Sequence, residues 1–285
     1  MSSLQNMKVA FIGSGVMAEA MIKGLIDKKL LTADQIVAAD PNEERGVELL
    51  NRYKGLHFTG DNGEAASGAD IVILSIKPQV LGHVIPALRR KAHDASMILS
   101  ILAGVRIRTL ADGLANPNIV RAMPNTPAQI GQGITVWTAT PEVAEDQRAQ
   151  AKALLGALGD EIYMDDEKYL DMTTALSGTG PAYVFLFMEA MIDAGVHMGF
   201  SRKDAERLVL QTMRGSVEYA LKSGLHPAQL RNQVTSPGGT SAEAIYQLEK
   251  GGLRTVLSRA VFAAYQRSVA LGEAQEKAHD KRDDG

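Results

Sequence analysis

A loop rich in glycine and hydroxyl side chains, spanning residues 233–243, leads directly into an apolar helical segment. Its two adjacent glycines, Gly238 and Gly239, let a small anion approach the backbone closely, because glycine has no Cβ. The helix that starts behind them offers unpaired N–H groups and the positive end of its dipole. The residue types and their order therefore predict a site for a carboxylate.

The first residues of that helix carry two hydroxyl groups with different expected roles. Thr240 and Glu243 match a capping box, in which each side chain accepts a hydrogen bond from a backbone N–H at the helix start. Thr240 is thus expected to be engaged in the cap. Ser241 keeps a hydroxyl that is free to donate to a ligand held over the helix start.

A second glycine loop lies near the beginning of the sequence, between an apolar run and a helical pattern. In a dinucleotide-binding loop the first glycine makes the turn, the second admits the pyrophosphate and the last small residue lets helix and strand pack closely. The matching residues are Gly13, Ser14, Gly15, Val16, Met17 and Ala18. We expect them to bind a nicotinamide dinucleotide; the alternative is a structural turn.

An acidic residue, Asp40, ends the second apolar run. Its carboxylate could accept hydrogen bonds from the ribose hydroxyls of the cofactor and would repel a 2′-phosphate. This favours NADH over NADPH, although Arg45 nearby could weaken the preference. The alternative is that Asp40 and Pro41 form an ordinary turn.

Three further segments could line the same site. Two of them follow predicted strands, at the carboxyl edge of a sheet where ligands bind in this class of fold: Ser75, Ile76, Lys77 and Pro78, and then Ile101, Leu102 and Ala103. Lys77 could face a cofactor phosphate or the nicotinamide ribose, or it could be an ordinary surface lysine. The third segment, residues 177–181, is expected to be a glycine and hydroxyl loop that lines the cleft or acts as a hinge.

The apolar pattern changes character part-way along the chain. Strands are predicted at 7–12, 36–39, 71–76, 97–101, 119–123, 133–138 and 161–164, with helices at 18–28, 43–53, 80–91 and 145–158. The apolar runs are continuous, as in strands buried on both faces, which predicts a parallel, doubly wound α/β sheet of the Rossmann type. Beyond it only helices are predicted, so we expect a dinucleotide-binding domain at 1–166 and an all-helical domain at 167–285.

The first long helix of the second half, near residues 181–198, is apolar on every side between Tyr183 and Met188. A helix of this kind must be covered from several directions. We expect a dimer interface; the alternative is the central helix of a monomeric bundle.

Composition excludes several other classes of protein. The 285 residues carry a net charge of -3, with no basic cluster suited to nucleic acid. The absence of Cys excludes a thiol nucleophile, and the six histidines show no metal-ligand spacing. Neither a signal peptide nor an apolar run of the roughly 20 residues needed to span a membrane is visible, so we expect a cytoplasmic protein.

Five segments together resemble pyrroline-5-carboxylate reductase, and the resemblance covers nearly the whole chain. They are residues 13–18, 77–78, 121–127, 176–183 and 234–241. The Thr-Ser-Pro-Gly-Gly-Thr run ahead of a helix is the most specific of them, whereas the first glycine loop is shared with many dehydrogenases.

The resemblance implies reduction of Δ1-pyrroline-5-carboxylate to L-proline, the last step of proline biosynthesis, with hydride from NADPH or NADH. It also implies a helical domain that interlocks with a partner into a homodimer, often assembled into a decamer of five dimers. Reduction of a cyclic imine fits the residues found, because it requires neither a nucleophile nor a metal.

Site residues are also implied by the resemblance. Backbone N–H groups that hold the substrate carboxylate map to Gly238, Gly239 and Thr240, and a hydroxyl that bonds the ring nitrogen maps to Ser241. The family usually has Thr there, and loss of the methyl group could loosen the rotamer. Family cofactor contacts match Asn62, Ser75 to Pro78 and Ile101 to Ala103.

Two other functions stay open. A β-hydroxyacid dehydrogenase would carry a catalytic lysine in the first helix of the second domain, and residues 182–197 contain none. A non-catalytic nucleotide sensor would not need a second hydroxyl-rich loop at a helix start.

Overall fold

The computed structural model describes residues 4–92 and 94–283; His93, one of the six histidines, lies outside this part. The chain forms two compact units. The first contains the residues up to Thr179 together with the segment from Ala264 onward, and the second runs from Gly180 to Ala263.

The first unit is built on an eight-stranded sheet, in the described part of the chain, with the order β3-β2-β1-β4-β5-β6-β7-β8. The strands are β1 (Val9–Ile12), β2 (Ile36–Ala39), β3 (His57–Thr59), β4 (Ile71–Leu74), β5 (Met97–Ser100), β6 (Ile119–Met123), β7 (Gly133–Ala139) and β8 (Gly159–Tyr163). All pairs from β3 to β6 are parallel, which confirms the doubly wound sheet of the Rossmann type. The expectation of a wholly parallel sheet is wrong at β7, which pairs antiparallel with β6, because the short η3 connection (Thr126–Ile130) cannot make a parallel crossover.

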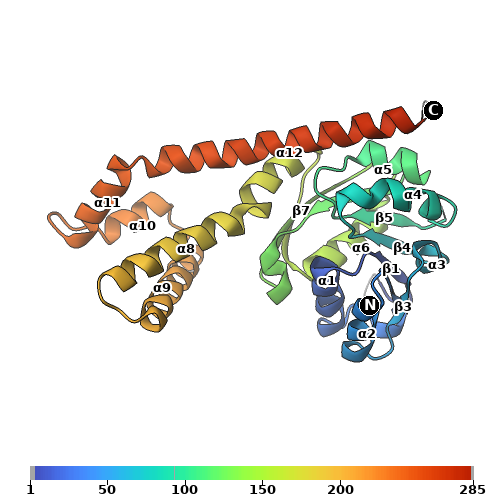
Figure 1. The fold of residues 1–285 in the computed structure, drawn as a ribbon, viewed down its shortest axis with the longest axis horizontal. Coiled ribbons are helices and arrows are strands. Elements are labelled where there is room, and N and C mark those ends of the chain that lie inside the picture. Colours follow the sequence, from blue (N-terminus) through green and yellow to red (C-terminus); the bar gives the residue numbers. More distant parts are fainter. Residues whose placement is uncertain (1–3, 93, 284–285) are drawn as a thin grey trace. The chain divides into compact units, whose positions relative to one another are not determined.

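Helices cover both faces of this sheet (Figure 1). One layer contains α1 (Val16–Asp27), α2 (Glu43–Arg52) and α6 (Glu145–Gly156), and the other α3 (Asn62–Ala66), α4 (Leu81–Arg89) and α5 (Ile107–Leu114). Side chains of β1 alternate between the two cores: Val9 and Phe11 join the first, and Ala10 and Ile12 the second. Burial on both faces explains the unbroken apolar runs in the sequence.

The strand register brings the predicted cofactor residues to one edge of the sheet. Ile12 pairs with Ala39 on one side and with Leu74 on the other, and Leu74 pairs with Ser100. The residues that follow these four strands therefore leave the sheet at the same edge. The strand order reverses between β1 and β4, which is the switch point where ligands bind in open α/β sheets.

The segment predicted as a glycine and hydroxyl loop, residues 177–181, is helical instead. Helix α7 (Lys168–Thr173) continues through a π-helical turn (Thr174–Gly178) into α8 (Gly180–His197). The Thr179 N–H donates to the Thr174 carbonyl at 2.8 Å, and a Cβ on Gly178 would lie 2.8 Å from the Met123 side chain. The glycine therefore serves close packing rather than a turn.

Every element of the described chain beyond β8 is helical, which confirms the all-helical C-terminal region. The second unit contains α8, α9 (Arg202–Ser223), α10 (Pro227–Gln233), α11 (Thr240–Lys250) and the first part of α12 (Leu253–Asp283). Helices α8 and α9 pack together where Gly195 meets Ala205. Much of the apolar surface of α8 is open, since Phe185 is 57% and Leu186 is 66% exposed.

The contacts divide the chain later than the boundary predicted between residues 166 and 167. Helix α7 packs on β6 and β7, and its Leu170 is fully buried. The end of α12 also belongs to the first unit, where the Ser268 hydroxyl donates to the Asp171 carboxylate at 2.8 Å. Because these contacts are remote in the sequence, the local pattern does not contain them.

Candidate functional site

Gly13 makes the turn between β1 and α1. Its φ of +91° lies in the left-handed region, and its N–H donates to the Ala39 carbonyl at 2.9 Å. A Cβ at this position would lie 2.8 to 2.9 Å from atoms of Ile76 and Ser75. The Ser75 hydroxyl donates to the Gly13 carbonyl at 2.7 Å and so ties the loop to the end of β4. Glycine is thus required here by both conformation and space.

Gly15 has a different environment. It is the N-cap of α1, and a Cβ there would meet no protein atom within 4 Å. Within the described residues, the N–H groups of Val16 and Met17 have no hydrogen-bond acceptor, while Ala18 is fully buried against the sheet. Open space, free donors and the positive end of a helix dipole fit the pyrophosphate of a dinucleotide.

Asp40 is fixed by backbone donors on both sides of its carboxylate. Its Oδ2 accepts from the Ser14 N–H and its Oδ1 from the Asn42 N–H, each at 3.0 Å. Ser14 itself is buried, and its hydroxyl donates to the Ala39 carbonyl at 3.2 Å. The carboxylate is therefore held beside the glycine loop, and its contact with a cofactor ribose stays a prediction.

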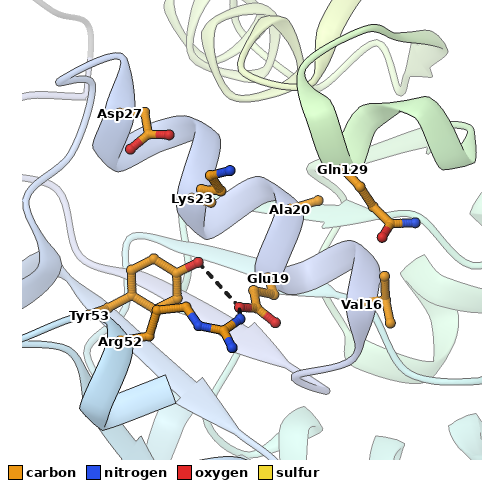
Figure 2. A pocket seen from close by; sticks show the side chains of 8 residues that line it. All are labelled: Val16, Glu19, Ala20, Lys23, Asp27, Arg52, Tyr53 and Gln129. Carbon is orange, nitrogen blue, oxygen red and sulfur yellow. Dashed lines mark hydrogen bonds and ion pairs between the residues drawn. The ribbon is translucent and has the colours of Figure 1, made fainter. Parts of the chain in front are cut away.

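An ion-pair network that sequence analysis missed lies beside this loop. The Glu19 carboxylate, on α1, pairs with both Arg45 and Arg52 and also accepts from the Tyr53 hydroxyl at 3.3 Å. Figure 2 shows the Arg52 and Tyr53 side chains directed toward Glu19, and all three line a pocket beside α1. Burial alone would raise the pKa of Glu19, but its hydrogen bonds to the two guanidinium groups and their charges outweigh that effect and hold the pKa below its ordinary value.

The remaining predicted cofactor residues follow the ends of β3, β4 and β5, at the same edge of the sheet. Lys77 is exposed and precedes the 3-10 turn η2 (Pro78–Val80). The Ile101 N–H donates to the Leu74 carbonyl, and the Leu102 N–H donates to the Ser100 hydroxyl. The next residue, Ala103, is exposed. Asn62 opens α3, whose first N–H groups are capped by the Asp61 carboxylate.

The predicted carboxylate loop belongs to the second unit. Gly238 has a φ of +69°, and a Cβ on Gly239 would lie 2.5 Å from the Ser236 hydroxyl oxygen. Among the described residues, the N–H groups and hydroxyls of Thr240 and Ser241 have no hydrogen-bond partner. Of the donors expected at this helix start, the Thr240 N–H and the Ser241 hydroxyl are thus available to a ligand, whereas the Gly239 N–H donates to the Ser236 carbonyl at 3.1 Å.

The capping box predicted for α11 is wrong. Gly239 is the N-cap, no side chain caps the helix, and the Glu243 carboxylate accepts from the Gln247 side chain at 2.9 Å. The helix starts one residue beyond Gly239, which places Thr240 inside its first turn, where a hydroxyl cannot act as the cap. Thr240 therefore also presents an unengaged hydroxyl.

Comparison with known proteins decides the family. Two family models match the chain: one described as pyrroline-5-carboxylate reductase dimerisation at residues 167–271, and one described as NADP oxidoreductase, coenzyme F420-dependent, at residues 8–104. The pyrroline-5-carboxylate reductase of Synechocystis is 41% identical over 94% of this chain and 99% of its own length, and that of Pseudomonas aeruginosa is 42% identical over 93% and 97%. The chain belongs to the pyrroline-5-carboxylate reductase family.

Solved structures agree with this assignment. The pyrroline-5-carboxylate reductase of Coxiella burnetii superposes with a TM-score of 0.86 at 34% identity, covering 94% of this chain and 99% of that one. The Plasmodium falciparum pyrroline carboxylate reductase, solved with NADP bound, gives 0.83 at 33% identity, with the same coverage. This member of the family is thus an NAD(P)H-dependent oxidoreductase.

The matched dimerisation region contains the exposed apolar surface of α8. The helical run Lys168–His197 is also long and apolar enough, by length and composition alone, to cross a membrane. A single run of this kind is weak evidence for a membrane span, and its place in a dimerisation domain accounts for its apolar surface. Within the described residues, no group of three His, Asp or Glu side chains could hold a metal ion.

Proposed function

We propose that this chain reduces Δ1-pyrroline-5-carboxylate to L-proline, using Ser241 and the two glycine loops described above. The observation that supports this reaction is the similarity of the chain, over most of its length, to two pyrroline-5-carboxylate reductases. The geometry of the Gly13 and Gly15 turn supports the cofactor half of the site, and the unengaged donors at the start of α11 support the substrate half.

The bound nicotinamide supplies the hydride, and the chain's own residues bind and orient the reactants. Gly13, Ser14, Gly15 and the first turn of α1 hold the pyrophosphate, and Asp40 accepts from the adenosine ribose. Asn62, Ser75 to Pro78 and Ile101 to Ala103 complete the cofactor site. Asp40 gives NADH an advantage over NADPH.

The N–H groups of Gly238, Gly239 and Thr240 hold the substrate carboxylate against the positive end of the α11 dipole, and Gly239 exchanges its hydrogen bond to the Ser236 carbonyl for one to the substrate. Ser241 lies in the first turn of the same helix, and its hydroxyl supports the ring nitrogen as the imine is reduced. Serine replaces the usual threonine, so the hydroxyl is present without the methyl group that would restrict its rotamers. The two loops belong to different units, and their meeting at one crevice stays a prediction.

A β-hydroxyacid dehydrogenase is the weaker proposal. Helix α8 contains no lysine for that chemistry, from Gly180 to His197. A nucleotide sensor without activity would leave the glycine and hydroxyl arrangement at the start of α11 without a purpose.

We further propose a cytoplasmic homodimer in which the apolar face of α8 is covered by a second copy, with five dimers able to form a decamer. Residues 167–285 act as the dimerisation and substrate domain, and residues 1–166 as the cofactor domain. We expect the protein to bind neither nucleic acid nor membranes. Light scattering of the purified chain tests the assembly: a monomer would contradict it.

The enzymatic test is proline formation from the imine with NADH or NADPH. We expect turnover with both cofactors, and a lower KM for NADH. A folded protein that makes no proline with either cofactor would exclude the function. Comparison with β-hydroxyacid substrates in the same assay separates the two enzyme classes.

A further inference from the structure

Asp40, the predicted contact of the adenosine ribose, is followed closely in the chain by further acidic groups, which disfavour a phosphate. Asp40 carries its negative charge directly after β2. The next residues that follow include Glu43 and Glu44, in the first turn of α2. The Asn42 side chain already accepts from the Glu44 and Arg45 N–H groups, so these donors of the α2 N-terminus are occupied.

Arg45 is the cation that could compensate, since it contacts the same loop as Asp40. Its Nε donates to the Ser14 carbonyl at 2.7 Å, and the Ser14 N–H donates to Asp40. Both of its remaining nitrogens are engaged, Nη1 with Glu48 at 2.8 Å and Nη2 with Glu19. All three guanidinium nitrogens therefore already have partners, which fix the position of the group and leave one N–H on each Nη for another ligand.

The two acidic partners of Arg45 are not equivalent. The Glu19 side chain is 16% exposed and pairs with Arg52 as well, whereas the Glu48 side chain is 59% exposed. An exposed ion pair contributes little to stability, and a partly buried carboxylate that pairs with two cations contributes more. Glu19 is thus the residue that fixes Arg45 against α1. Its other two partners, Arg52 and Tyr53, are shown in Figure 2.

We propose that Glu19 is a specificity-determining residue that favours NADH, because it holds Arg45 away from the 2′-phosphate position. This inference rests on the proposed cofactor site. Release of Arg45 would let its guanidinium either pair with the 2′-phosphate or neutralise Asp40. Both outcomes reduce the discrimination against NADPH.

The test compares dissociation constants of NADH and NADPH, measured by calorimetry on the full-length protein, with kinetics measured in parallel. Glu19→Gln should raise the affinity for NADPH relative to NADH about tenfold, the effect of one charge-assisted hydrogen bond. Glu48→Gln makes the same chemical change on the exposed partner and should alter the ratio less than twofold. Adding Arg45→Gln to Glu19→Gln should abolish the gain.

Three results would overturn the inference: an unchanged ratio in Glu19→Gln, an equal shift in Glu48→Gln, or a gain that persists without Arg45. If Glu19→Gln does not fold, Arg45→Gln alone is decisive. It should leave the ratio unchanged, because Arg45 does not serve the phosphate in the natural protein, and a selective loss of NADPH affinity would contradict this. A shifted binding ratio without imine reduction would support the inference and exclude the proposed function.

Discussion

Replacing each of the two glycines of the first loop with alanine should affect the stability and cofactor binding of the protein differently. At Gly13 the methyl group would lie within 3 Å of the Ile76 and Ser75 backbone, and alanine would have to adopt a φ of +91°. The left-handed conformation costs about 1–2 kcal/mol, and overpacking a filled site costs about 1–3 kcal/mol. Gly13→Ala should therefore lower the free energy of unfolding by about 2–5 kcal/mol and weaken cofactor binding.

Gly15→Ala is the matched control. Its φ of -67° and ψ of -174° suit alanine, and the added methyl group would meet no protein atom within 4 Å. The stability should change by less than about 1 kcal/mol, because the lower entropy of the unfolded chain offsets the weaker N-cap. The methyl group would, however, occupy the space expected for the pyrophosphate, so cofactor affinity should fall at least about tenfold.

Thermal unfolding and calorimetric titration with NADH separate the two effects. A melting temperature lower by roughly 5–15 °C is expected for Gly13→Ala and a nearly unchanged one for Gly15→Ala. Cofactor affinity within threefold of the natural protein in Gly15→Ala would refute our interpretation of this loop. Equal destabilisation by both substitutions would refute the assignment of different roles.

Three further predictions concern other parts of the molecule. Ser241→Ala should lower kcat about tenfold, the contribution of one hydrogen bond, while Ser241→Thr keeps activity and both keep NADH affinity; unchanged kinetics in Ser241→Ala would remove the hydroxyl from the mechanism. Arg121→Met should lower the free energy of unfolding by about 2–3 kcal/mol, because it leaves Glu167, 2.6 Å away, and Asp171 without their buried cation. Arg108→Met breaks only an exposed ion pair and should lower it by less than about 0.5 kcal/mol. Equal effects of the two substitutions in urea titrations would contradict this. Because the folded-state pKa of Glu19 is lowered, its ion pairs stabilise the protein above pH 4.5, the ordinary pKa of the group, and this stability is lost as the pH falls through the folded-state pKa. Glu19→Gln should therefore lose less stability than the natural protein as the pH falls below 4.5. Parallel acid-unfolding curves of the two proteins would argue against this.

The sequence predicted the parts of the fold that depend on local pattern. The buried run Val9–Ile12 and its neighbours were identifiable because both faces of these strands are apolar. Strand β3 was missed because its three residues, His57 to Thr59, are exposed or half-buried and form no apolar run. The π-helical turn at residues 174–178 was misassigned because its glycine and hydroxyl residues are typical of loops, and only packing on Met123 reveals their role.

The candidate site shows the same limit. Asp40 was found because it ends a strand, and the register brings it to Gly13. The engagement of Arg45 by Glu19 joins residues from two helices, and no local pattern indicates it. The absence of a cap by Thr240 likewise depends on where the α11 backbone starts.

Transfer of labelled hydride tests the central claim most directly. Purified protein would be given the imine and NADH that carries deuterium at the transferred position, and the product would be analysed by mass spectrometry and NMR. We predict L-proline with one deuterium on the former imine carbon. Proline without deuterium, or no proline from a folded protein that binds NADH, would contradict the proposal that this chain joins a dinucleotide and a cyclic imine for direct hydride transfer.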